Sequence, residues 1–205
     1  MLTAKRIQPP LKDTIFDLDD LCDRGWDVRG SRCELLLELK LQFPELKVTL
    51  FAIPGLSSLT FLSKLAKENW IELAVHGWTH QPNTECEGWS ELFAHKVLDA
   101  VESWGVFQKG FKAPGWRTPT LVSKVLADRG YWLMHNRESV TQPQDPRTKI
   151  FWAPHPWLVH GHMQDIESAN PLLRNGLRQL IEERGFPWDE DTHFHFISEI
   201  LRERG

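Results

Sequence analysis

The clearest indication of the fold comes from residues 71–80, which read IELAVHGWTH. The first five of these residues are mostly apolar, as is typical of a buried strand. His76 and His80 follow at a spacing of four, so both imidazoles can turn onto one ion just beyond the strand. Histidines at this spacing also occur on protein surfaces, so the meaning of the pair depends on the residues that follow the other strands.

Apolar runs of strand length alternate with helical patterns along the chain. The predicted strands are Thr14–Leu18, Lys47–Ile53, Ile71–Val75, Gly110–Ala113, Tyr131–His135, Lys149–Trp152, Trp157–His160 and the start of His193–Arg202. The predicted helices are Arg32–Phe43, a segment from Ser57 or Ser58 to about Lys67, Ser90–Ser103, Pro119–Asp128, Pro171–Arg184 and the end of His193–Arg202. This order predicts a single α/β domain over residues 1–205, with mostly parallel strands and helices outside them.

Composition and charge exclude several classes of protein. The 205 residues carry a net charge of −4 and contain no basic block, which argues against nucleic-acid binding. No apolar run reaches the length of a membrane span, and residues 1–10 lack the apolar region of a signal peptide. Cys22, Cys33 and Cys86 have unrelated spacings, so we expect reduced thiols and a cytoplasmic protein.

Polar side chains follow four of the predicted strands. They are Asp19 and Asp20, His76 and His80, Lys112 and Arg117, and His160 and His162. In barrels of parallel strands, the carboxyl ends of the strands build the active site, so we expect these side chains to converge. Four strand ends with polar groups are stronger evidence than any one motif.

Two imidazoles and one carboxylate are a common ligand set for a metal ion. Zn²⁺ bound in this way keeps a position open for water or substrate, and non-haem Fe(II) uses a similar set. A carboxylate beside the ion can take a proton from water that the ion has made more acidic. Asp19 and Asp20 could fill these two roles if the chain bends where the strand ends.

Taken together, these motifs resemble the NodB-homology polysaccharide deacetylases, carbohydrate esterase family 4. The resemblance rests on Asp-Asp after the first strand, His-x-x-x-His after the third, the turn Phe111–Trp116 and the late Leu158-Val159-His160, and it covers Thr14 to His162. It implies a distorted (β/α) barrel and a divalent metal, usually zinc.

The resemblance also implies roles for individual residues. Asp20, His76 and His80 would bind the metal, and Asp19 would be the general base. The late motif supplies a general acid, for which His160 fits the family pattern and His162 is a rival.

The turn after residue 110 departs from the family pattern in one place. Lys112 stands where the family has arginine; it can hold a charge beside Asp19, and Arg117 could compensate by reaching back. The backbone N–H near Gly115 would donate to the oxyanion. Trp116 and Trp78, with Trp157, could stack on a sugar or fill the core and the barrel mouth.

The expected activity is therefore the hydrolysis of an N-acetyl or similar acyl group on an amino sugar or sugar-containing substrate. One alternative is a deformylase or another C–N hydrolase that acts on a lipid- or nucleotide-linked sugar. Another is a non-catalytic carbohydrate-binding barrel. Two departures from the family pattern suggest it, namely Lys112 and Gly161, which follows His160 where the family usually has Asp or Ser.

Overall fold

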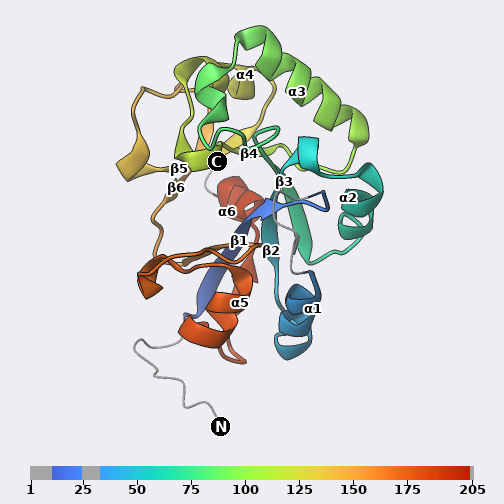
Figure 1. Ribbon diagram of the computed structural model, residues 1–205, viewed down its shortest axis with the longest axis vertical. Helices are drawn as coiled ribbons and strands as arrows, with labels where there is room; N and C mark the ends of the chain where they lie inside the picture. Colours follow the sequence, from blue (N-terminus) through green and yellow to red (C-terminus); the bar gives the residue numbers. More distant parts are fainter. Residues whose placement is uncertain (1–10, 25–32, 204–205) are drawn as a thin grey trace.

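The strands form one parallel sheet that curls into a distorted half-barrel (Figure 1). The computed structural model describes residues 11–24 and 33–203. The strands are β1 (Asp13–Leu21), β2 (Val48–Ala52), β3 (Ile71–His76), β4 (Gly110–Lys112), β5 (Trp132–Asn136), β6 (Lys149–Ala153), β7 (Leu158–His162) and β8 (His193–His195). Their order is β6-β5-β4-β3-β2-β1-β7, and β8 pairs with the start of β1. The predicted α/β class and barrel-like parallel sheet are thus confirmed.

Helices follow most of the strands, as the sequence predicts. They are α1 (Cys33–Gln42), α2 (Leu59–Leu65), α3 (Glu91–Trp104), α4 (Thr120–Asp128), α5 (Leu177–Gln179) and α6 (Ile197–Glu203). Ser58 and Ser90 cap α2 and α3, because each hydroxyl accepts a backbone N–H from three residues on. The first residue of the predicted Arg32–Phe43 helix lies outside the described residues. Short turns occupy η1 (Pro54–Leu56), η2 (Glu85–Gly88), η3 (Pro114–Trp116), η4 (Arg137–Ser139), η5 (Pro171–Leu173) and the π-helical η6 (Leu180–Arg184).

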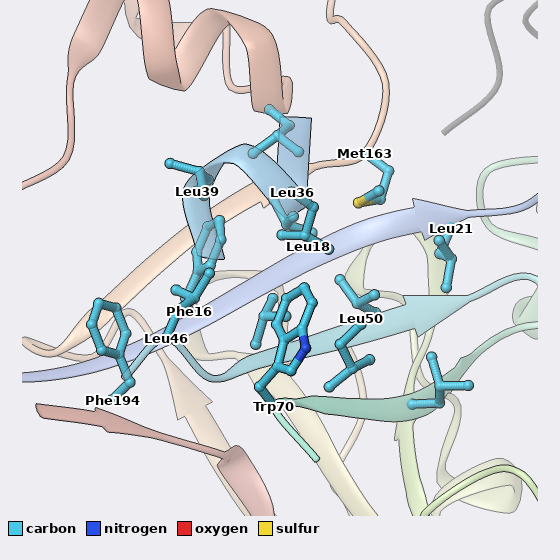
Figure 2. Packing of buried hydrophobic residues seen from close by; sticks show 14 of the residues in the cluster. Phe16, Leu18, Leu21, Leu36, Leu39, Leu46, Leu50, Trp70, Met163 and Phe194 are labelled. Carbon is cyan, nitrogen blue, oxygen red and sulfur yellow. The ribbon is translucent and has the colours of Figure 1, made fainter. Parts of the chain in front are cut away.

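The outer face of the sheet is apolar and packs against the helices. Phe16 and Leu18 of β1 meet Leu36 and Leu39 of α1, and Leu50 of β2 lies in the same cluster (Figure 2). Farther along the sheet, the outward residues of β3, β4 and β5 pack against α3 and α4. Because side chains alternate along a strand, the residues between these positions all face the inside of the barrel.

The inner face of the sheet is largely apolar where α6 packs against it, toward the amino ends of the strands. Ile15, Phe51 and Trp132 form a buried cluster there with Ile197 and Ile200 of α6. Helix α6 therefore plugs this end, and it lies in the middle of the curled sheet in Figure 1. The inner face also carries a buried polar pair there, Thr49 and Glu72, which are bonded to each other, whereas the larger groups of polar side chains lie at the carboxyl ends of the strands.

The predicted long helix over Pro171–Arg184 is wrong. This segment forms η5, then breaks at Asn175 and Gly176, and continues as the short α5 and η6. Asn175 O accepts the N–H of His162, and Gly176 forms a parallel bridge with His162. These backbone groups extend the pairing of β7 and cannot at the same time continue a helix.

Two expectations from composition can be compared with the structure. No disulfide joins Cys22, Cys33 and Cys86, all of which lie within the described residues. Within residues 11–24 and 33–203, none of the helices has the length and apolar character needed to cross a bilayer.

Candidate metal centre and active site

A bulge in β1 turns two consecutive carboxylates toward the inside of the barrel. Leu18 pairs with Leu50 and Leu21 with Ala52, so β1 contains one residue more than β2 across this interval. Asp20 lies in this interval and has a φ of 65°, which interrupts the alternation of the strand. Asp19 keeps the inward direction of Ile15 and Asp17, and the bulge turns Asp20 inward as well.

Asp20, His76 and His80 converge at the ends of β1 and β3. All three are buried, and their ligand atoms lie within 4.8 Å of one another. The Nε2 atoms of His76 and His80 lie 3.4 and 3.2 Å from Asp20 Oδ1. The structure thus brings together the three residues that the sequence suggested as metal ligands.

The chemistry of this group fits a cation. His76 Nδ1 lies 2.9 Å from the carbonyl oxygen of Lys112, which can only accept, so Nδ1 carries the proton. In a neutral His76, the Nε2 lone pair therefore points toward Asp20 Oδ1. That oxygen is buried and accepts no hydrogen bond from the described residues. Lone pairs that face one another in a buried site are stabilised by a positive ion, as in zinc centres.

The ionisation of these groups points the same way. Burial disfavours the charged form of Asp20, but the adjacent His76 outweighs it, and the pKa of Asp20 is lowered. Burial also opposes protonation of His76, yet Asp19 and Asp20 raise its pKa. The pKa of His80 is lowered by burial and by the charge of His76. These shifts favour an ionised Asp20 and a positive charge beside it.

Glu85 holds the loop that carries His80. Its buried carboxylate accepts the backbone N–H groups of Trp78, Thr79 and His80 at 2.6–3.1 Å and the hydroxyl of Thr79 at 2.9 Å. A Cβ at Gly77, where φ is 62°, would collide with this carboxylate. Glu85 was missed in the sequence, because nothing in its spacing distinguishes it from a surface glutamate.

We expect Glu85→Gln to weaken Zn²⁺ binding about 10–100-fold, the usual cost of losing a partner behind metal ligands. The amide keeps the shape of the side chain but loses the charge that holds three N–H groups. Glu87→Gln, on the exposed side of the same turn, is the matched control. Competition with a chelator of known affinity measures both; equal affinities would contradict the role of Glu85.

Lys112 lies beside the triad and is fully buried. Its Nζ atom is 2.8 Å from both carboxylate oxygens of Asp19 and 3.3 Å from Asp17 Oδ2. The ring of Trp116 lies over the ammonium, with its centroid 3.8 Å away. Burial disfavours ionisation of Asp19, but Lys112, followed by His76, overcomes it and holds the pKa of Asp19 well below its usual value.

Asp17 connects Lys112 with the late histidine motif. Residues 17 and 160 are register partners in β1 and β7, so both side chains face inward. His160 Nδ1 lies 2.9 Å from Asp17 Oδ2, and its Nε2 lies 3.8 Å from Asp19 Oδ2. Sequence reasoning passed over Asp17, although its spacing of two from Asp19 places both on one face of a strand.

His162 is the register partner of Asp19 and also points inward. Its Nδ1 lies 2.9 Å from Asn175 Oδ1, and burial lowers its pKa. Gly161, between the two histidines, faces the outer side, where a Cβ would lie 2.5 Å from Leu180 Cδ1. Packing on the outer face therefore accounts for glycine at this position, and residue 161 is not part of the site.

The remaining predicted residues are arranged around this centre. Gly115 has a φ of 60° and packs on Asn83, and Trp116 lies edge-on to His160 with ring centroids 5.5 Å apart. Arg117 is not among the described cations paired with Asp19; Lys112 fills that place itself.

The other two tryptophans considered for sugar stacking lie against protein. The ring of Trp78 packs near Trp104 of α3, at 6.5 Å between centroids. Trp157 precedes β7 and stacks on His195, at the amino ends of the strands. Trp157 thus lies at the opposite end of the strands from Asp19 and Asp20, where its backbone oxygen accepts from Ile15.

A pocket of about 680 Å³ lies at the opposite end of the barrel from these groups. Its lining includes Glu68, Lys109 and Lys149, which precede or begin β3, β4 and β6. The side chains that converge at the carboxyl ends of the strands, among them Asp19, Asp20, His76 and Lys112, do not line this pocket.

The sequence matches no family model and no curated protein. Among solved structures, the Xyl-CE4 domain of a multidomain xylanase from the hindgut metagenome of Trinervitermes trinervoides has a TM-score of 0.55 and 18% identity, over 95% of this chain and 92% of that one. The 4-alpha-glucanotransferase from Thermococcus litoralis has a TM-score of 0.61 and 14% identity, over 96% of this chain and 41% of that one. This chain has the fold of a carbohydrate esterase family 4 domain, as its motifs led us to expect.

Proposed function

We propose that this chain is a metal-dependent hydrolase of the NodB-homology family that removes an N-acetyl or similar acyl group from an amino sugar. The main support is one observation: the triad of Asp20, His76 and His80 directly adjoins Asp19, which is paired with a buried lysine. A cation site next to an oriented carboxylate suits the hydrolysis of an unactivated amide. The fold likeness to a Xyl-CE4 domain is consistent with a carbohydrate substrate.

The chain's own residues supply the proton transfers in this proposal. A divalent ion at the triad, most suitably Zn²⁺, would acidify water and polarise the acyl oxygen when bound. Asp19 takes a proton from the attacking water, and Lys112 keeps Asp19 ionised and oriented. Water oxygen bonds to the acyl carbon, the C–N bond breaks, and a protonated histidine gives its proton to the departing amine.

His160 is the better general acid of the two late histidines. Its Nδ1 bonds to the Asp17 carboxylate, which orients the ring with Nε2 toward Asp19, whereas the Nδ1 of His162 faces a neutral amide oxygen.

Asp17→Asn is expected to lower kcat about 10²–10⁴-fold, the range typical of losing acid–base catalysis, and to leave KM nearly unchanged. The variant keeps the shape of Asp17 but loses the carboxylate that orients His160 and pairs with Lys112. Asp13→Asn, at the other end of the same strand, is the control. A variant with wild-type kcat would remove Asp17 from the mechanism.

The test of the proposed function is acid release from acylated amino sugars by the metal-loaded chain. Free, nucleotide-linked and lipid-linked sugars with N-acetyl and N-formyl groups are compared, and acetate and formate are measured separately. Acetate release that is lost with chelation and restored by Zn²⁺ supports the proposal. Sugar binding that survives chelation, with no acid released, would instead favour a non-catalytic carbohydrate-binding barrel.

A further inference from the structure

A second group of ligand-type side chains lies beside the triad and shares no residue with it. Asp19, His160 and His162 each offer one ligand atom, and these atoms lie within 4.8 Å of one another. They come from neighbouring positions on the inner faces of β1 and β7. The site thus has two halves: Asp20, His76 and His80 form one, and Asp19, His160 and His162 form the other.

Both histidines of this second group are held as metal ligands usually are. Asp17 accepts from His160 Nδ1 and Asn175 Oδ1 lies against His162 Nδ1, each at 2.9 Å. Because a carboxylate oxygen of Asp17 accepts at Nδ1, a neutral His160 carries its proton there and turns the Nε2 lone pair toward Asp19. Bonding of one ring nitrogen to an acceptor while the other remains available is the usual support of a histidine ligand.

We propose that Asp19, His160 and His162 form a second metal site, which binds a Zn²⁺-like ion more weakly than the triad and inhibits the enzyme when filled. Two imidazoles favour zinc and similar ions over Mg²⁺ and Ca²⁺, which prefer all-oxygen ligands. The inhibitory part rests on the proposed function, whereas the binding part does not.

Charge explains why the second ion binds more weakly. Asp17, Asp19 and Asp20 share the site with the single ammonium of Lys112, so one divalent ion already balances the excess negative charge. The second ion must also approach an oxygen that Lys112 contacts at 2.8 Å. Repulsion from the ammonium and from the first ion reduces its affinity.

Filling the second site would remove the groups that move protons. Its ligand atoms are a carboxylate oxygen of Asp19 and a ring nitrogen of each late histidine, so neither base nor acid would remain available. Activity is therefore expected to rise with the first equivalent of zinc and fall with the second.

The experiment is a zinc titration of the full, metal-free chain. Equilibrium dialysis against buffered Zn²⁺, with elemental analysis of the protein, is expected to show two binding steps. His162→Gln should lose the weaker step, and His80→Gln should weaken the tighter one. His193→Gln, an exposed histidine on β8, should keep both steps. A wild type that saturates in one step, or a folded His162→Gln that keeps two, would overturn the second site.

Asn175→Ala tests the second site more specifically than His162→Gln, because it keeps all the proposed ligands. It removes only the acceptor of His162 Nδ1, so the weaker step should shift about 10–100-fold to higher zinc while the tighter step stays in place. An unshifted weaker step in this variant would also refute the site. Two-step binding without activity at any zinc level would count against the proposed hydrolysis alone, and activity with one-step binding against the second site alone.

Discussion

Asp19→Asn is expected to reduce acyl-group release about 10²–10⁴-fold while the chain still binds Zn²⁺ at the triad. The amide can accept a hydrogen bond from Lys112 but cannot take a proton from water. Asp20, His76 and His80 keep their positions, because the bulge in β1 and the Glu85 loop do not depend on the charge at residue 19. Steady-state kinetics and metal analysis on the same preparation measure the two effects.

Asp13→Asn serves again as the control, since it changes a carboxylate on the same strand but at the opposite end. Full activity in Asp19→Asn would refute its assignment as the base. Loss of the first equivalent of zinc in Asp19→Asn would instead make residue 19 a ligand of the triad ion.

Lys112→Met is expected to destabilise the fold by about 3–5 kcal/mol, because it leaves Asp17 and Asp19 buried without their cation. For a chain of this size, that corresponds to a fall in Tm of about 6–20 °C. Lys124→Met, in an exposed pair with Glu91, is the control and should change stability by less than about 1 kcal/mol. Thermal unfolding of the metal-free proteins followed by circular dichroism measures both.

A triple variant distinguishes charge from packing. Combining Lys112→Met with Asp17→Asn and Asp19→Asn removes the unpaired carboxylates, so most of the lost stability should return. If the triple variant stays as unstable as Lys112→Met, the lysine acts through its packing against Trp116 and Phe51 and not through its charge.

Much of the site could be predicted because its residues follow apolar strands. The runs before Asp19, His76 and Lys112 are recognisable as strands, and parallel strands bring their carboxyl ends together whatever their order. The direction of Asp20 was harder to foresee. Two adjacent residues on a regular strand face opposite ways, and only the bulge brings both carboxylates inward.

The remaining features depend on contacts between distant parts of the chain. The pairing of Asp17 with His160 requires the register of β1 against β7, which the sequence of either strand does not contain. The helix predicted over Pro171–Arg184 failed for a similar reason, since backbone groups at Asn175 pair with His162. The local sequence pattern thus predicted which polar residues lie at the strand ends. The pairing of distant strands determines which of these side chains are in contact.

Lys112 serves the two halves of the site through different atoms. Its carbonyl oxygen orients His76, whereas its ammonium binds Asp19. A carbonyl is present whatever the side chain, so under the proposed function a different side chain at this position would change the setting of Asp19 while the acceptor of His76 remains. The lysine that stands where the resemblance implies an arginine is one such exchange. The proposed base and the proposed metal ligands could therefore vary separately, although a single residue supports both.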